Sequence, residues 1–180
     1  MHFRIGPLKK CKVRIFYDVA PDLPVVAVVG LGPSNAGFNE LEEIDEKNEN
    51  IRAAISAGVR SLRDLGSIEE IAVDSCQNPV ASAEGAKLGL YYFDELKGSS
   101  LKKPQVTVNL LKNDPADEQK WNLGTTLSVG QNLCRSLMEN PANIMTPTNF
   151  AKIATERLQK LYFYRINLQL FAYFFPSLVV

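Results

Sequence analysis

The sequence has few of the residues that most often carry metal or nucleophilic chemistry. It contains one histidine, His2, and three widely separated cysteines, Cys11, Cys76 and Cys134. A zinc site of cysteine and histidine ligands needs closely spaced pairs, and no CxxC pair occurs. A nucleophilic cysteine or serine would need His2, beside the chain end, as its base. We therefore expect free thiols in a reducing compartment, and no catalytic or metal-binding residue in this chain.

Neither sign of charge is in excess. Twenty basic and twenty acidic residues give a formal net charge of zero, and the densest basic stretch, residues 8–14 (LKKCKVR), is short. Nucleic-acid binding normally leaves a basic patch, so the charge pattern excludes nucleic acid as a partner. The first residues also carry no apolar stretch of the length found in secretory signal peptides. We expect a cytoplasmic protein.

Two patterns that could bind a ligand fall short of a known site. Residues 29–37 (VGLGPSNAG) resemble a strand followed by a glycine loop, but the third glycine is displaced from the GxGxxG spacing and a proline intervenes. Acidic clusters occur at residues 42–46, 69–70, 94–95 and 114–118. A hard cation needs oxygen ligands from converging points of the chain, so we interpret these clusters as solvated faces and the glycine loop as a tight turn.

The first half of the chain is rich in strand and helix signals. Residues 13–17 and the run Val25–Val29 predict neighbouring strands, the second being β-branched throughout except for Ala27 and bounded by proline and glycine, as in buried parallel strands. From about residue 40 to 64 the pattern becomes helical. The inward stripe of this helix is Ile51, Ile55, Val59 and Leu62. Residues 68–73 predict a further short strand.

The second half predicts three more helices and one strand. Pro79 begins a helix that we expect to reach Leu96, with Gly85 and Gly89 allowing close packing against the sheet. Residues 105–111 alternate as a strand. A long helix ends before Pro141, and Thr146-Pro147 caps a last helix. The expected apolar face of the long helix comprises Leu123, Leu127, Gly130, Cys134, Leu137 and Met138.

Strands therefore alternate with helices along most of the chain. This order predicts the α/β class, with a mixed, mostly parallel sheet flanked by helices, followed by a helical linker. The apolar fraction of 46% is sufficient for a packed core.

An atypical aromatic tail occupies residues 161–180, which contain seven aromatic residues and no acidic one. A membrane anchor is one interpretation, but it needs about 20 mostly apolar residues, and Arg165, Asn167 and Gln169 fall within the window. A charged residue near the centre of a membrane span is costly. We favour the alternative of a tail that is foreign to the fold, left by splicing or by a mis-set gene boundary.

Two longer stretches resemble the leucyl aminopeptidase family of metallo-exopeptidases. They are residues 83–97 (AEGAKLGLYYFDELK) and residues 130–151 (GQNLCRSLMENPANIMTPTNFA). The resemblance extends more loosely over residues 9–160. It implies an α/β N-terminal domain, lacking its first strand or strands, followed by the start of the family's catalytic domain.

The resemblance also implies an activity that this chain does not carry by itself. Family members remove N-terminal amino acids from peptides with two divalent metals, zinc or manganese, and usually assemble as hexamers. Their metal-binding residues lie in strings similar to GKGITFDSGG and NTDAEGRL, and neither string occurs here. We therefore expect no catalytic, cofactor-binding or metal-binding residue in this chain, and an inactive protein that resembles a truncated aminopeptidase.

The expected organisation follows from the resemblance. Residues 1–115 form the N-terminal α/β domain, residues 116–160 form the linker helix and the start of the catalytic domain, and residues 161–180 form the tail. Expected partners are further copies of the chain or full-length aminopeptidase subunits, and peptide substrates only in the full-length enzyme. Two alternatives remain open: a non-catalytic assembly or regulatory module, and a small-ligand-binding α/β domain.

Overall fold

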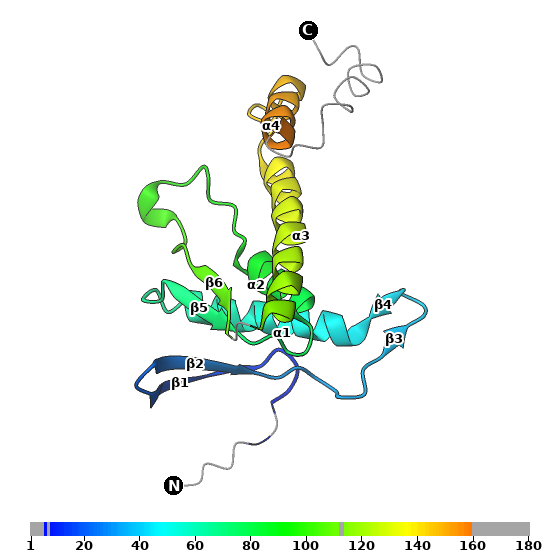
Figure 1. Cartoon of the computed structure of the whole chain (residues 1–180). Helices are drawn as coiled ribbons and strands as arrows, with labels where there is room; N and C mark the ends of the chain where they lie inside the picture. The colour runs from blue at the N-terminus through cyan, green and yellow to red at the C-terminus, as the bar shows by residue number, and fades with distance from the viewer. Residues whose placement is uncertain (1–5, 7, 112–113, 160–180) are drawn as a thin grey trace. The chain divides into compact units, whose positions relative to one another are not determined.

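The computed structural model describes residues 6, 8–111 and 114–159 (Figure 1). The chain divides into two compact units, Met1–Asn132 and Leu133–Val180. The elements are β1 (Val13–Ala20), β2 (Leu23–Val29), β3 (Phe38–Asn39), β4 (Ile44–Asp45), α1 (Glu46–Arg63), β5 (Glu70–Val73), α2 (Pro79–Leu90), the 3-10 helix η1 (Ser99–Leu101), β6 (Thr107–Leu110), α3 (Pro115–Glu139) and α4 (Pro147–Gln159). The aromatic tail of residues 161–180 lies outside the described residues.

The first two strands form an antiparallel hairpin, drawn in blue in Figure 1. Val13 pairs with Val29, and the strands are joined by a turn at Pro21 and Asp22. The prediction that Val25–Val29 belongs to a parallel pair is therefore wrong. A two-residue turn can join only antiparallel neighbours, because parallel strands need a long crossover between them. A β-branched run does not by itself reveal its pairing direction.

The parallel pair of the fold is β5 with β6, and α2 lies between them in the sequence. Ile71 pairs with Val108 and Val73 with Leu110, as expected for a β-α-β crossover. The third pair, β3 with β4, is antiparallel and two residues long. The predicted α/β class is confirmed, while parallel pairing in the described part of the chain is confined to β5 with β6 and an isolated bridge between Lys10 and Gly30.

Helix α1 begins where local signals direct it to begin. The Asp45 carboxylate accepts a hydrogen bond from the Asn48 backbone N–H at 3.1 Å, which satisfies one of the free donors of the first turn. The predicted inward stripe is largely confirmed, because Ile51, Val59 and Leu62 are buried. Val59 and Leu62 pack with residues of β5, β6, α2 and α3 in one core. That core comprises Val59, Leu62, Ile71, Val73, Ala83, Ala86, Val108 and Trp121.

Helix α2 is shorter than predicted. It begins at Pro79, as expected, with the Asn78 side chain accepting a hydrogen bond from the Ala81 N–H at 3.1 Å. It ends at Leu90 because Tyr91 already has an extended backbone, with ψ of 133°. Six consecutive residues from Ala81 to Ala86 are buried, so this helix is apolar or small on most of its faces. The apolar residues after Leu90 continued the helical pattern without extending the helix.

Helix α3 buries a different face from the predicted one. Its buried residues are Trp121, Gly124 and Ser128, whereas Leu123 is 54% exposed and Leu127 is 46% exposed. An added Cβ on Gly124 would lie 2.5 Å from the Val80 carbonyl oxygen, so small residues let α3 approach α2 closely. Cys134, expected in the core, is exposed.

The second unit contains the end of α3 and helix α4. Pro147 stands at the start of α4, and the Thr146 hydroxyl accepts a hydrogen bond from the Asn149 N–H at 3.3 Å. The predicted cap and first helical proline are confirmed. No helix among the described residues is long and apolar enough to span a membrane.

Candidate functional site

Glycines bring α1 and α2 into close contact. A Cβ on Gly85 would lie 2.6 Å from the backbone oxygen of Arg52, and one on Gly89 would lie 2.8 Å from the Cα of Ser56. Both distances are shorter than real Cβ contacts. The prediction of close packing through these two glycines is confirmed, but their partner is helix α1 and not the sheet.

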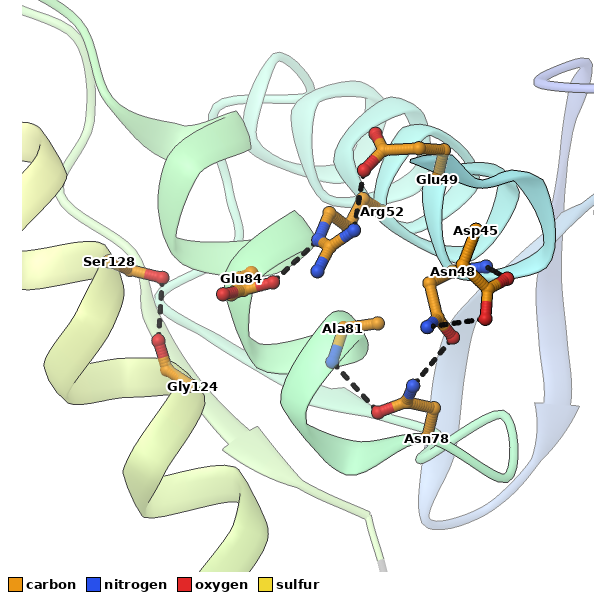
Figure 2. A network of polar contacts seen from close by, with 9 residues as sticks. All are labelled: Asp45, Asn48, Glu49, Arg52, Asn78, Ala81, Glu84, Gly124 and Ser128. Atoms are coloured by element: carbon orange, nitrogen blue, oxygen red, sulfur yellow. Dashed lines mark hydrogen bonds and ion pairs between the residues drawn. The ribbon is translucent and has the colours of Figure 1, made fainter. Parts of the chain in front are cut away.

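A polar cluster runs along this helix contact (Figure 2). The Arg52 guanidinium on α1 donates to the Glu84 carboxylate on α2 at 2.5 Å, and also pairs with Glu49 one turn earlier on its own helix. The Glu84 side chain is only 8% exposed, so this ion pair is partly desolvated. Burial acts to lower the pKa of Arg52, but the two carboxylates outweigh burial and raise that pKa above its ordinary value.

Two asparagines connect the N-terminal ends of the same helices. The Asn78 side chain, which caps α2, donates to the side-chain oxygen of Asn48 at 2.6 Å. Asn48 in turn donates to Asp45, which caps α1. The caps of the two helices are therefore joined through side chains, as Figure 2 shows. The cluster has a structural role, because Arg52 is paired with Glu49 and Glu84 and the Asp45 carboxylate already accepts hydrogen bonds from Asn48.

The acidic clusters seen in the sequence do not converge. Asp45 caps α1, Asp114 accepts a hydrogen bond from the Ala116 N–H, and Asp94 accepts one from the Lys103 N–H. Glu70 accepts a hydrogen bond from the Asn109 side chain. Within the described ranges, no three residues among His, Cys, Asp and Glu are grouped as metal ligands would be. The grouping of these side chains in the described part of the chain therefore does not fit the two-metal centre that the sequence resemblance implies for full-length relatives.

The glycine loop after β2 makes backbone contacts of its own. A Cβ on Gly30 would lie 2.3 Å from the Lys9 carbonyl oxygen, and Gly32 has a φ of 89°. Gly30 is therefore required by close approach to the preceding segment, and Gly32 by its left-handed backbone. Both observations fit the predicted tight turn.

A cavity of about 300 Å³ lies where β2, α1 and β5 meet, and the sequence pattern did not predict it. Its lining is almost entirely apolar; Asp74 is its one charged residue and Cys76 its thiol. Burial, and then the Asp74 carboxylate, raise the pKa of the Cys76 thiol. The thiol is therefore protonated at neutral pH and a poor nucleophile. The sequence carried one signal for this cavity: neither Val25–Val29 nor Ile71–Val73 contains a charged residue. This pattern indicates two apolar strands, but it does not show that both border the same cavity.

Proteins of known name resemble this chain over most of its length. Cytosol aminopeptidase of Bos taurus is 48% identical over 153 residues, covering 85% of this chain and 28% of that protein. The Homo sapiens protein of the same name is 45% identical with the same coverage. Cytosol aminopeptidase of Dictyostelium discoideum is 34% identical over 151 residues, which cover 82% of this chain. The chain thus spans less than a third of the length of these relatives.

Solved structures agree with the sequence comparison. The bottromycin maturation enzyme BotP matches with a TM-score of 0.65 and 26% identity, covering 85% of this chain and 32% of that one. BotP in complex with Mn matches with a TM-score of 0.62 and 27% identity, covering 82% of this chain and 30% of that one. Residues 9–100 match the profile described as the cytosol aminopeptidase family, N-terminal domain. The chain therefore belongs to the cytosol aminopeptidase family and carries its N-terminal domain.

Proposed function

We propose that this chain serves as the N-terminal scaffold of a cytosolic aminopeptidase and contributes no reacting group itself. The observation that carries the proposal is the 48% identity to Bos taurus cytosol aminopeptidase across 85% of the chain. The family activity would be metal-dependent removal of N-terminal amino acids from peptides. In this proposal, the residues that carry out that chemistry belong to the part of such a protein that this chain does not match. The proposed location is the cytosol, in accordance with the names of the relatives.

The division of labour within the chain is also a proposal. Residues 1–115 would form the N-terminal domain, and residues 116–160 would lead from it into the catalytic domain. Supporting this role, the charged residues between α1 and α2 are paired with each other rather than directed at a shared ligand. In this proposal the domain's contribution is mechanical: it supplies a rigid body that other parts of the enzyme or other subunits contact.

An activity assay tests the scaffold role. The purified chain is incubated with leucyl p-nitroanilide and either Mn²⁺ or Zn²⁺, with purified bovine cytosol aminopeptidase as the positive control. We expect no release of nitroaniline above the metal-only blank. Metal-dependent turnover that co-elutes with the chain through two unrelated chromatographic steps would disprove the scaffold assignment.

A second candidate function is a non-catalytic assembly module, and the exposed side of α3 favours it. Leu123 and Leu127 lie one helical turn apart and are 54% and 46% exposed. Apolar side chains at this spacing suit a helix that packs on another subunit. Co-expression of the chain with tagged bovine cytosol aminopeptidase tests it. We expect the wild-type chain to be retained with the tagged enzyme and the Leu123→Glu/Leu127→Glu variant to be lost. Equal retention of the two chains would reject an assembly role mediated by α3.

A further inference from the structure

A loop of irregular backbone connects α2 to β6. It covers residues 91–106 and contains the short helix η1, and Figure 1 shows it in green. Residues 91–94 belong to neither a helix nor a strand, and the backbone of Tyr91 is extended. The next residue, Tyr92, is 44% exposed. An enzyme that modifies a side chain can reach such a segment, because the segment lies on the surface and outside the regular elements.

Two lysines converge on the Tyr92 side chain. The Lys97 ammonium donates a hydrogen bond to the Tyr92 hydroxyl oxygen at 2.6 Å and lies 4.5 Å from the centre of the ring. The Lys103 ammonium lies 5.9 Å from the same centre. The Lys97 N–H donates to the Asp94 carbonyl at 3.0 Å, and this turn brings Lys97 back to Tyr92. Both cations therefore lie close to any negative charge placed on the Tyr92 oxygen.

The carboxylates near this loop already have partners. Asp64 contacts Arg63 at 3.0 Å and Lys103 at 3.2 Å, and Asp94 accepts a hydrogen bond from the Lys103 N–H at 2.9 Å. Lys97 differs from them, because its partner is the neutral Tyr92 hydroxyl and it forms no ion pair in the described part of the chain. A new anion at Tyr92 would therefore meet an available cation in Lys97.

The other described tyrosines lack this combination of features. Tyr17 is 61% exposed, but it lies in β1, where it pairs with Val25. Tyr91 is only partly exposed and stands at the end of α2. Among the tyrosines that the structure describes, Tyr92 alone combines an exposed ring, an irregular backbone and two nearby ammonium groups.

We propose that Tyr92 is a phosphorylation site, modified by a protein tyrosine kinase with ATP as the phosphoryl donor. In this step the Tyr92 oxygen bonds to the γ-phosphorus of ATP, the bond from that phosphorus to the ADP oxygen breaks, and the hydroxyl proton passes to the catalytic aspartate of the kinase. The phosphate carries a charge of about −1.5 to −2 at neutral pH. The inference does not depend on peptidase activity.

The phosphate changes how the loop is held. Lys97 and Lys103 form charge-assisted hydrogen bonds with its oxygens. Because Lys103 also contacts Asp64, which follows the last residue of α1, the modified loop is tied more firmly to the end of that helix. Phosphorylation at Tyr92 therefore orders the connection between α2 and β6.

Phosphorylation of the full chain tests the site. A broad-specificity tyrosine kinase is first selected for activity on a synthetic peptide of residues 88–97 (LGLYYFDELK). The folded chain is then incubated with this kinase and ATP, and the modified positions are located by tandem mass spectrometry. We expect Tyr92 to be modified at least about tenfold faster than Tyr17, whose strand must first open. The Tyr92→Phe variant should lose this phosphate.

Two outcomes would overturn the proposed site. One is a folded chain that carries no phosphate at Tyr92 although the kinase modifies Tyr92 in the peptide. The other is modification of Tyr17 at an equal or higher rate, since accessibility in this loop would then give Tyr92 no preference.

Phosphorus NMR of the modified chain tests the two lysines. The Tyr92 phosphate is identified as the signal that is absent from the Tyr92→Phe variant. Nearby cations favour its more highly charged form, so we expect its titration midpoint to lie at least about half a pH unit below that of the phosphorylated peptide. Lys97→Met should move the midpoint toward the peptide value, and Lys102→Met, on the same loop, is the matched control and should not. Equal midpoints in chain and peptide, or equal effects of the two variants, would overturn the pairing that the proposal assigns to Lys97 and Lys103.

Discussion

At the scale of single residues, the contact between α1 and α2 depends on the absence of side chains. Gly85→Ala would place a methyl group 2.6 Å from the Arg52 carbonyl oxygen, so the helices must move apart. We expect a loss of about 1–3 kcal/mol in the free energy of unfolding, despite the higher helix propensity of alanine. Urea unfolding followed by the fluorescence of Trp121, the one tryptophan, measures it.

Gly130 on α3 is the matched control for this substitution, because an added Cβ there meets nothing within 4 Å. Gly130→Ala should stabilise the protein by up to about 1 kcal/mol through helix propensity alone. If Gly85→Ala and Gly130→Ala shift the urea midpoint in the same direction, Gly85 is not needed for close packing of α1 against α2.

The ion pair between Arg52 and Glu84 is a second test at the residue scale. Arg52→Met leaves the Glu84 carboxylate, 8% exposed, without its main partner. Removing one partner of a fully buried pair costs about 3–5 kcal/mol. Because the Arg52 side chain is 33% exposed and water screens the pair, we expect about 1–3 kcal/mol by urea unfolding.

Two further variants check that the ion pair is the cause. Glu49→Gln removes the more exposed partner of Arg52 and should cost less than about 1 kcal/mol. The double variant Arg52→Met/Glu84→Met should be more stable than Arg52→Met alone, since it leaves no unpaired charge. A double variant that is less stable would mean that Glu84 has another indispensable role.

Asp64 links stability to pH. Its carboxylate contacts Arg63 at 3.0 Å and Lys103 at 3.2 Å. Burial acts to raise the pKa of Asp64, but the two cations outweigh it and hold that pKa below its ordinary value of 3.8. A carboxylate with a lowered folded pKa contributes stability above its unfolded pKa, and that contribution disappears as the pH falls through the folded pKa.

The variant Asp64→Asn should therefore be less stable than wild type at about pH 6. The difference between them should shrink as the pH falls below about 4. Urea midpoints across this range measure the effect, and Asp94→Asn serves as a comparison at a second aspartate near Lys103. A difference that stays constant down to about pH 2 would show that ionisation of Asp64 does not stabilise the fold.

At the scale of the elements, features set by the local sequence could be predicted, and contacts between elements could not. The cap Thr146 acts on its own helix, so the sequence alone located the start of α4. The start of α1 was predicted too early, near residue 40, because the residues before Glu46 form β3, β4 and a turn, and Asp45 caps the helix. The inward stripe of α1 was predictable because it is continuous and apolar. For α3, two faces competed, a leucine stripe and a face of small residues around Gly124. Which one is buried depends on the shape of α2, which periodicity does not encode.

The same distinction explains the candidate sites. Gly85 and Gly89 were identified as close-packing residues because glycine is costly inside a helix, but their partner helix could not be identified from α2 alone. The cavity was not predictable, because it is formed by β2, α1 and β5 together and contains no unusual residue. The expectation that no residue of this chain is catalytic stays a prediction.

At the scale of the whole molecule, the core lies far from the chain's C-terminal end in sequence. Its members run from Val59 to Trp121 and belong to the unit Met1–Asn132. Residues 168–175 (LQLFAYFF) have high β propensity and no charge, a composition typical of aggregation-prone segments. Removing residues 161–180 should therefore raise the soluble yield at least about twofold and leave the urea midpoint unchanged. A truncated chain that no longer unfolds cooperatively would place the tail in the core. If the full-length chain fractionates with membranes and the truncated chain does not, the tail is an anchor.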